Sequence, residues 1–205
     1  MFPTVEVRWF SQGKIPNQIR NWFRSGDFIP EDQELRTDYY LRIAEGDFLG
    51  VKLREGRVEV KQRYQPGMTR QFGDRSSGLV EAWFKWGFGL DEGSEEVFRV
   101  KVFLDQWVGV NKERTLRKFQ VIEDGRVEET SATDVIQTGC ALELAQVHLE
   151  GVSDLWWSVG FEAFGETGKR RNALILVAED VLSSEGAPVL KVEESFSYPR
   201  WLISA

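Results

Sequence analysis

The segment FLGVKLREGRVEVKQRY, residues 48–64, concentrates five cationic side chains in a stretch where apolar and polar residues alternate. A two-residue turn at Glu55-Gly56 would make it a β-hairpin with Arg54 opposite Arg57. Like charges directly opposed destabilise a strand pair by about 0.2–1 kcal/mol, so this face requires either solvent or a bound anion. The hairpin therefore predicts a cationic sheet face that carries Lys52, Arg54, Arg57 and Lys61.

Single glutamates lie between apolar neighbours in four other alternating segments, at Glu6, Glu81, Glu143 and Glu162. Glu59 is on the charged face of the hairpin. Further cations occupy alternating segments at Lys85, Arg99, Lys101 and Arg117. If these faces turn inward, the buried charges need partners or ligands. A polyanion fits such mixed walls, held by the cations on one side and by a carboxylate-bound Mg²⁺ on the other.

The elements that would position these residues are mainly antiparallel strands, because alternation with period two recurs along the chain. Strands are predicted at 4–10, 35–43, on both arms of 48–64, and at 79–86, 97–104, 115–121, 141–149 and 156–164. Helices are predicted at 16–25 and 172–182, the second capped by Asn172. Segments 65–78, 89–96, 123–134 and 183–188 are rich in turn residues and predict loops.

These elements predict an α+β fold that is predominantly antiparallel β. About eight strands would form a closed or nearly closed barrel, since closure protects strand edges, with a few flanking helices. Residues 1–205 are predicted to be a single domain.

The order of these segments resembles the CYTH, or triphosphate tunnel metalloenzyme, superfamily. That family opens with a Glu-x-Glu-x-Lys strand, to which Thr4, Glu6 and Arg8 are similar. Residues 36–40, RTDYY, resemble its Asp-x-Tyr strand, and residues 52–54, KLR, resemble its basic hairpin. The acidic strands follow in the same order. The resemblance implies an eight-stranded tunnel that holds a triphosphate with inward Lys and Arg and a divalent metal with glutamates.

Transferred to this sequence, the resemblance implies catalytic roles for Glu6 and Arg8. It implies anion binding by Lys52, Arg54, Arg57, Lys61, Lys85, Arg99, Lys101 and Arg117. It implies metal binding, of Mg²⁺ or Mn²⁺, by Glu6, Glu59, Glu81, Glu143 and Glu162. The expected function is binding of a triphosphate or another linear polyanion, with metal-dependent hydrolysis as one outcome.

Two departures from the family pattern leave other functions open. Thr4 stands where the first glutamate is expected, which reduces the charge available to Mg²⁺. Arg8 stands where a lysine is expected, and an always-charged arginine cannot accept a proton. A barrel that binds an anion or a partner without catalysis is one alternative. A lipocalin-like barrel for an apolar ligand, with charges outward and tryptophans inward, is another.

Composition limits the remaining classes of function. The net charge of −7 argues against a nucleic-acid-binding protein. No apolar run approaches the ~20 residues that span a bilayer, and the start of the chain lacks a signal-peptide pattern, so a cytoplasmic protein without membrane contact is expected. Cys140 and His148 are predicted to be structural. The eight tryptophans predict a core or a contact with a second copy in a homodimer.

Overall fold

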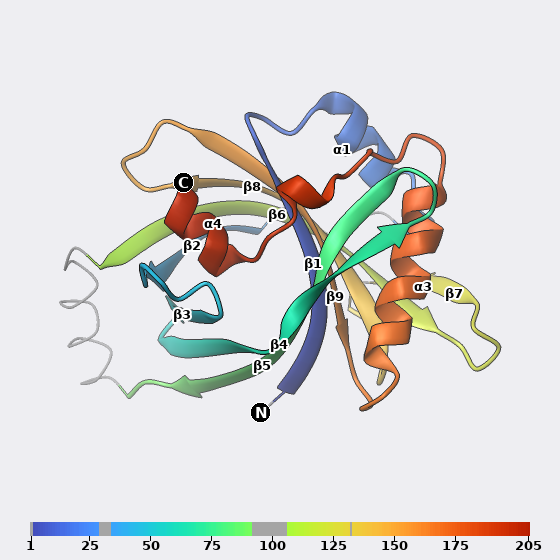
Figure 1. Cartoon of the computed structure of the whole chain (residues 1–205), viewed down its shortest axis with the longest axis horizontal. Helices are drawn as coiled ribbons and strands as arrows, with labels where there is room; N and C mark the ends of the chain where they lie inside the picture. The colour runs from blue at the N-terminus through green and yellow to red at the C-terminus, as the bar shows by residue number, and fades with distance from the viewer. Residues whose placement is uncertain (1, 29–33, 92–105, 132) are drawn as a thin grey trace.

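The structure is a computed structural model that describes residues 2–28, 34–91, 106–131 and 133–205. Nine strands of these residues form one antiparallel sheet (Figure 1). They are β1 (Phe2–Gln12), β2 (Glu34–Leu41), β3 (Leu49–Arg54), β4 (Arg57–Phe72), β5 (Ser76–Gly89), β6 (Trp107–Val121), β7 (Val127–Thr130), β8 (Gly139–Leu149) and β9 (Leu155–Phe164).

Eight of the nine strands close into a barrel in the order β2-β3-β4-β5-β1-β9-β8-β6, because β2 also pairs with β6. β7 lies outside the closed ring and pairs only with β6 among the described strands. The predicted α+β fold with a closed antiparallel barrel is confirmed. The predicted strand at 97–104 lies outside the described residues.

The hairpin β3–β4 has the register that the sequence predicts. Arg54 lies opposite Arg57, and Lys52 lies opposite Glu59. Both turn residues have positive φ, 49° at Glu55 and 69° at Gly56, as a tight type I′ turn requires. A slip of one residue would exchange the apolar and charged faces, so this turn fixes which side chains point inward.

The apolar faces of β1, β5, β8 and β9 point outward and pack against two helices, α1 (Asn17–Arg24) and α3 (Arg170–Ser183). In α1 the buried residues are the predicted i, i+3 and i+4 set of Ile19, Trp22 and Phe23. The predicted cap at Asn172 is wrong, because α3 begins at Arg170. These helices cover the outside of the barrel and leave its charged faces inside.

The loop predicted for residues 65–78 is wrong, because β4 continues to Phe72 and β5 begins at Ser76. Pro66 and Gly67 fall where the register between the two strands shifts, and a bulge accommodates residues that a regular ladder would reject. The extended hairpin reaches α3, where Arg70 lies 3.9 Å from Glu179 (Figure 1). β7 was also missed, because it lies in a segment rich in turn residues.

The C-terminal segment crosses the barrel wall and places a short helix, α4 (Tyr198–Ser204), against the inner face. The pairing of β1 with β5 ends at Glu6 and Glu81, and Ser195 then forms a bridge to Trp9. Trp201 and Leu202 of α4 are buried against inward side chains of β1, β2, β6 and β8. The C-terminus is thus docked on the barrel, and α4 forms a plug at one end of it.

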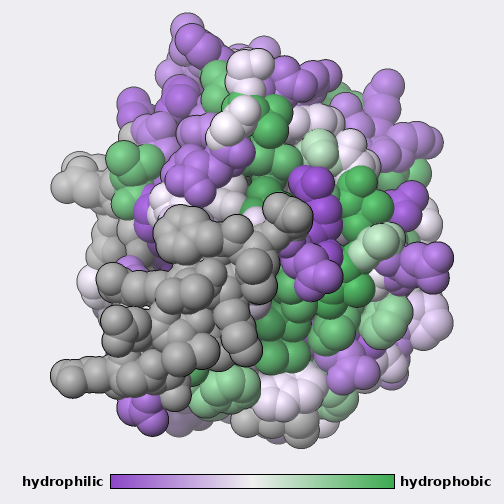
Figure 2. Space-filling view, turned by 90° about the vertical axis from the view of Figure 1, so that its left-hand side faces the viewer, coloured by the Kyte–Doolittle hydropathy of each residue, from purple (hydrophilic) through white to green (hydrophobic). Residues whose placement is uncertain are grey.

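A third apolar cluster lies on the opposite side of β2, β3 and β4 from the charged residues, around the buried Leu53 and Val58. Figure 2 shows hydrophobic residues gathered on one face of the molecule, beside segments that the structure does not describe. Pairing with a second copy stays a prediction. No described helix has the length and apolar character needed to cross a membrane.

Candidate functional site

A cavity of about 130 Å³ lies inside the barrel, bordered by α4. Glu6, Lys52 and Glu143, which come from three separate strands, all line it. Among the described residues eight cations and four carboxylates border this space, together with Gly50, Trp83 and aromatic or small residues of the plug. The barrel therefore collects positive charge inside a chain that is acidic as a whole.

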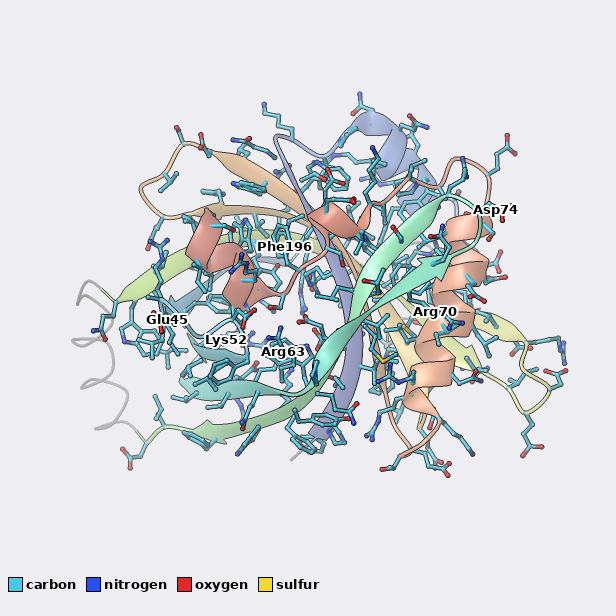
Figure 3. The ribbon with its side chains drawn as sticks, viewed as in Figure 1. Glu45, Lys52, Arg63, Arg70, Asp74 and Phe196 are labelled. Carbon is cyan, nitrogen blue, oxygen red and sulfur yellow. The ribbon has the colours of Figure 1, made fainter. Side chains whose placement is uncertain are left out.

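A cationic wall lines the cavity along β2, β3 and β6, formed by Arg36, Lys52, Arg54, Lys112 and Arg114. Asp38, which is fully buried, lies 3.2 Å from Arg36, 3.2 Å from Lys52 and 3.6 Å from Lys112. One carboxylate is thus the shared ion-pair partner of three cations. Figure 3 shows Lys52 on the inner side of the barrel, near α4.

Glu59 of β4 has a similar position between cations. It lies 3.2 Å from Lys52, 3.5 Å from Arg54 and 3.8 Å from Lys85. The pKa of Glu59 is low because these cations outweigh its burial. Glu59 is therefore the shared ion-pair partner of three cations, and its metal-binding role stays a prediction.

The opposite side of the lumen carries a carboxylate row on β5, β1 and β9, formed by Glu81, Glu6 and Glu162. Glu6 lies directly opposite Glu81 on one neighbour and opposite Glu162 on the other. Lys61 of β4 contacts Glu6 and lies 3.7 Å from Glu162, while Arg63 contacts Glu81. Cations of β4 therefore reach every member of the row.

Arg8 connects the row to the plug. Its guanidinium donates to Glu143 at 2.6 Å and to the Ser158 hydroxyl at 3.2 Å, and it lies 4.9 Å from the ring centre of Tyr198. Gly160 provides the space, since a Cβ there would come within 2.6 Å of the guanidinium. A glycine on β9 thus allows the buried Arg8 to extend across β9 to Glu143 on β8.

Tyr198 of α4 is held between two cations. The first cation is Arg8. The second is Lys112, whose ammonium lies 3.7 Å from the ring centre of Tyr198 and donates to the Tyr40 hydroxyl at 2.9 Å. Both contacts are favourable because the ring face is negative. The plug therefore touches the cavity cations directly, and its position is coupled to theirs.

Burial and neighbouring cations shift the ionisation of the lumen. Burial, together with nearby cations, lowers the pKa of Lys52 and of Lys112 to about 8. Burial alone would raise the pKa of Glu143, but Arg8, Lys112 and Arg114 hold it well below its usual value. Burial raises the pKa of Glu6, whereas Lys61 and Lys85 hold the pKa of Glu162 low. Positive potential therefore dominates around Glu143.

The structure brings together many of the residues that the sequence singles out. The residues that line the cavity are Glu6, Arg8, Lys52, Arg54, Glu59, Lys61, Lys85, Glu143 and Glu162. Glu81 is on the same sheet face, since it lies opposite Glu6, and is bonded to Arg63. Arg99 and Lys101 lie outside the described residues. The roles assigned to these residues stay predictions.

Two predicted anion ligands lie elsewhere. Arg57 is exposed at the end of the hairpin and does not line the cavity. Arg117 is opposite Leu142, whose side chain packs on the outer core, and donates to both carboxylate oxygens of Glu129 at 2.7 Å. Arg117 shares its face of β6 with Phe119, which packs in the outer core, whereas Lys112 and Arg114 are on the inner face. Cys140 is buried, and burial raises the pKa of its thiol, in keeping with its predicted structural role.

Several lumen residues were missed as candidate ligands, namely Arg36, Lys112, Arg114 and Tyr198. Lys112 and Arg114 lie in β6, which begins at Trp107, eight residues before the predicted start at 115. The period-two pattern continues upstream of residue 115, where polar or small residues alternate with Val108, Val110, Lys112 and Arg114. Extending the pattern in this direction would have found both cations. Nothing in the sequence of α4 shows that Tyr198 enters the barrel.

Comparison with known proteins adds little beyond this geometry. No protein-family model matches the chain. No curated protein matches it. One similar solved structure is the putative adenylyl cyclase HpAC1 from Hippeastrum, which is described as having a dominant triphosphatase activity. It has 12% identity and a TM-score of 0.44 over 92% of this chain and 89% of that one. The chain folds as the closed antiparallel barrel that the resemblance to the triphosphate tunnel superfamily implies.

The low pKa values of Lys52 and Lys112 predict how anion binding depends on pH. Both lysines are charged below pH 8 and lose their charge as the pH rises through about 8, so their contribution to affinity is lost there. We expect Lys52→Met to weaken triphosphate binding roughly tenfold near pH 7. The ratio of wild-type to variant affinity should approach one by about pH 9.5.

Calorimetric titration at each pH measures this ratio, which cancels the titration of the anion itself. Lys14→Met, at an exposed lysine away from the cavity, is the matched control. A ratio that stays constant across this pH range would contradict the proposed ionisation.

Proposed function

We propose that the barrel binds a linear polyphosphate, with inorganic triphosphate or the triphosphate group of a larger molecule as the ligand. The observation that carries this proposal is the excess of eight cations over four carboxylates around one cavity. The cations include four arginines, whose guanidinium groups match phosphate oxygens in a fork geometry. Positioning and charge neutralisation are the main requirements for holding a polyphosphate.

The size and shape of the cavity favour a small, compact anion. Its volume of about 130 Å³ corresponds to roughly ten water molecules at 10–15 Å³ each. Tyr198 and Pro199 of the plug line it, so a ligand inside lies against α4. The cationic wall and Lys61 face this space from strands β2, β3, β4 and β6, which allows several phosphate groups to be contacted at once.

The carboxylates fit a divalent metal poorly. Oxygen ligands suit Mg²⁺, but Lys61 and Arg63 already contact the three glutamates of the carboxylate row. Glu59 and Glu143 lie among cations instead. Within the described ranges no group of three or more acidic, histidine or cysteine side chains is arranged to hold a metal. The function that we propose is therefore binding of the polyphosphate, without a hydrolytic step through a metal.

The interior charges contradict a lipocalin-like barrel. Such a barrel would direct its charges outward, but Glu6, Glu143 and Glu162 line the cavity with the cations. The inward tryptophans do not form an apolar pocket either, since the cations of Lys61 and Arg63 each lie 5.8 Å from the ring centre of Trp83. An apolar ligand would have to displace ionic contacts on every side.

Two arginines of the hairpin provide a matched test of the proposal. We expect triphosphate to raise the melting temperature of the wild type, and Arg54→Ala to weaken its binding about 10- to 100-fold, the value of one or two charged hydrogen bonds. Arg57→Ala should leave the affinity unchanged, because Arg57 lies opposite Arg54 in register but is exposed outside the cavity.

Calorimetry gives the affinities, and a phosphate-release assay reports whether the bound compound is hydrolysed. Pyrophosphate and sulfate are the comparison anions. A melting temperature unaffected by any of these anions would exclude the proposed function, and equal losses in both variants would place the ligand outside the cavity.

A further inference from the structure

The three glutamates of the carboxylate row are placed as neighbours by strand register alone. Glu6 is directly opposite Glu81 on β5 and Glu162 on β9, and opposed residues of antiparallel strands point to the same face with Cβ atoms about 4.5–5.5 Å apart. Three adjacent carboxylates repel one another, so the folded barrel needs a cation beside them. In protein sites of this chemistry that cation is commonly Mg²⁺ or Mn²⁺.

Here the cation is a side chain. The ammonium of Lys61 contacts Glu6 and lies 3.7 Å from Glu162, which places it between two members of the row. Its side chain keeps 27% exposure, and the residue lines the cavity, so it also faces the space where an anion would lie. Burial opposes the charge of Lys61, but Glu162 and Glu6 outweigh it and raise its pKa.

The third glutamate of the row, Glu81, is paired with Arg63. One Nη of Arg63 contacts Glu81, and the other donates to Asp47 at 3.0 Å. Figure 3 shows Arg63 in the interior of the barrel, on the same side as Lys52. This pairing leaves Glu6 and Glu162 as the two members of the row that line the cavity, with Lys61 between them.

We propose that the Lys61 ammonium takes the place of a divalent cation in this barrel. It neutralises Glu6 and Glu162 and presents its remaining N–H groups to the bound anion. Resting on the proposed function, triphosphate then binds without a divalent metal. Removal of Lys61 leaves a two-carboxylate site that accepts Mn²⁺.

The first test uses the wild type alone. Triphosphate affinity is measured by calorimetry with EDTA and with excess Mg²⁺. We expect the affinity in EDTA to equal or exceed that with Mg²⁺, because Mg²⁺ removes negative charge from the free anion. Binding that requires Mg²⁺ would overturn the proposal.

The second test measures Mn²⁺ without any phosphate compound. We expect Lys61→Met to bind one Mn²⁺ per chain, while the wild type binds none at the same concentration. Binding is measured as the loss of the free-Mn²⁺ signal in electron paramagnetic resonance. Lys85→Met is the matched control, because Lys85 lies directly opposite Lys61 and lines the same cavity but contacts Glu59. It should gain no Mn²⁺.

The two tests separate this inference from the proposed function. If the wild type binds no triphosphate in any condition but Lys61→Met gains Mn²⁺, the proposed function fails and the role of Lys61 stands. If folded Lys61→Met, verified by circular dichroism, gains no Mn²⁺, or if Lys85→Met gains as much, the role of Lys61 is refuted. If Lys61→Met does not fold, the wild-type comparison still decides whether binding requires metal.

Discussion

Asp38→Asn is expected to lower the free energy of unfolding by about 3–5 kcal/mol, the cost of removing one partner from a buried ionic cluster. Asp38 is fully buried and lies within 3.6 Å of Arg36, Lys52 and Lys112. Asparagine keeps the shape of the side chain but leaves three neighbouring cations without their shared carboxylate. Urea denaturation of wild type and variant measures the loss.

The same variant distinguishes an anion site from a structural ion cluster. Near pH 6 the lysines remain charged, so a bound triphosphate would supply the negative charge that Asp38 no longer provides. We therefore expect triphosphate to raise the melting temperature of Asp38→Asn by more than it raises that of the wild type. If Asp38→Asn loses stability and triphosphate raises its melting temperature no more than that of the wild type, the ion cluster only stabilises the fold.

Glu129→Gln is the matched control for this experiment. Glu129 is also buried in a bidentate ion pair, with Arg117, but this pair lies on the outer side of the barrel. Its loss should destabilise the chain in a similar way, and triphosphate should not restore more stability than it does in the wild type. If triphosphate restores equal stability to Asp38→Asn and Glu129→Gln, the gain is a general effect of salt.

The pH dependence of stability should also differ between the wild type and Asp38→Asn. Burial alone would raise the pKa of Asp38, but Lys112, Lys52 and Arg36 lower it. A carboxyl whose folded pKa is lowered stabilises the fold above its unfolded pKa, and this stabilisation is lost as the pH falls through the folded value. Asp38→Asn should therefore remove part of the acid sensitivity of the wild type.

The alternation of residues was sufficient to predict the barrel because each strand has one apolar and one charged face. The tight turn at Glu55-Gly56 then fixed the register of the hairpin, and with it the pairing of Lys52 with Glu59. Local pattern decides these features, since a slip of one residue would exchange the apolar and charged faces of the hairpin. The faces of Glu6, Glu143 and Glu162 followed from the same pattern.

The pairing of charges across the barrel could not be predicted from the sequence. Lys61 of β4 reaches Glu6 on β1 and Glu162 on β9, which are not its neighbouring strands, and these contacts depend on the curvature of the sheet across β5 and β1. Arg117 and Arg114 are three positions apart on β6, so they point to opposite faces, and Arg117 shares the outer face with Phe119. Sequence pattern gives the face of a strand, whereas the partner of each charge depends on curvature and closure.

Trp201→Ala is expected to lower the free energy of unfolding by about 3–5 kcal/mol, the usual cost of removing a large aromatic ring from a core. Trp201 is fully buried, and its ring stacks on Phe10 with centroids 5.2 Å apart. It also meets the edge of Trp156. α4 has seven residues, too few for a helix to be stable in water, so its order depends on this packing.

The same substitution should weaken triphosphate binding, because the packing of Trp201 determines where Tyr198 lies. Tyr198 contacts both Arg8 and Lys112, so a displaced plug leaves these cations without the ring that holds them. Arg200→Ala is the control on the same helix, since Arg200 is exposed and a surface change of this kind alters stability by about 0.5 kcal/mol or less. Calorimetry and urea denaturation measure both effects. If Trp201→Ala loses stability but binds triphosphate as tightly as Arg200→Ala does, the plug only completes the core, and the cations keep their positions through the strands alone.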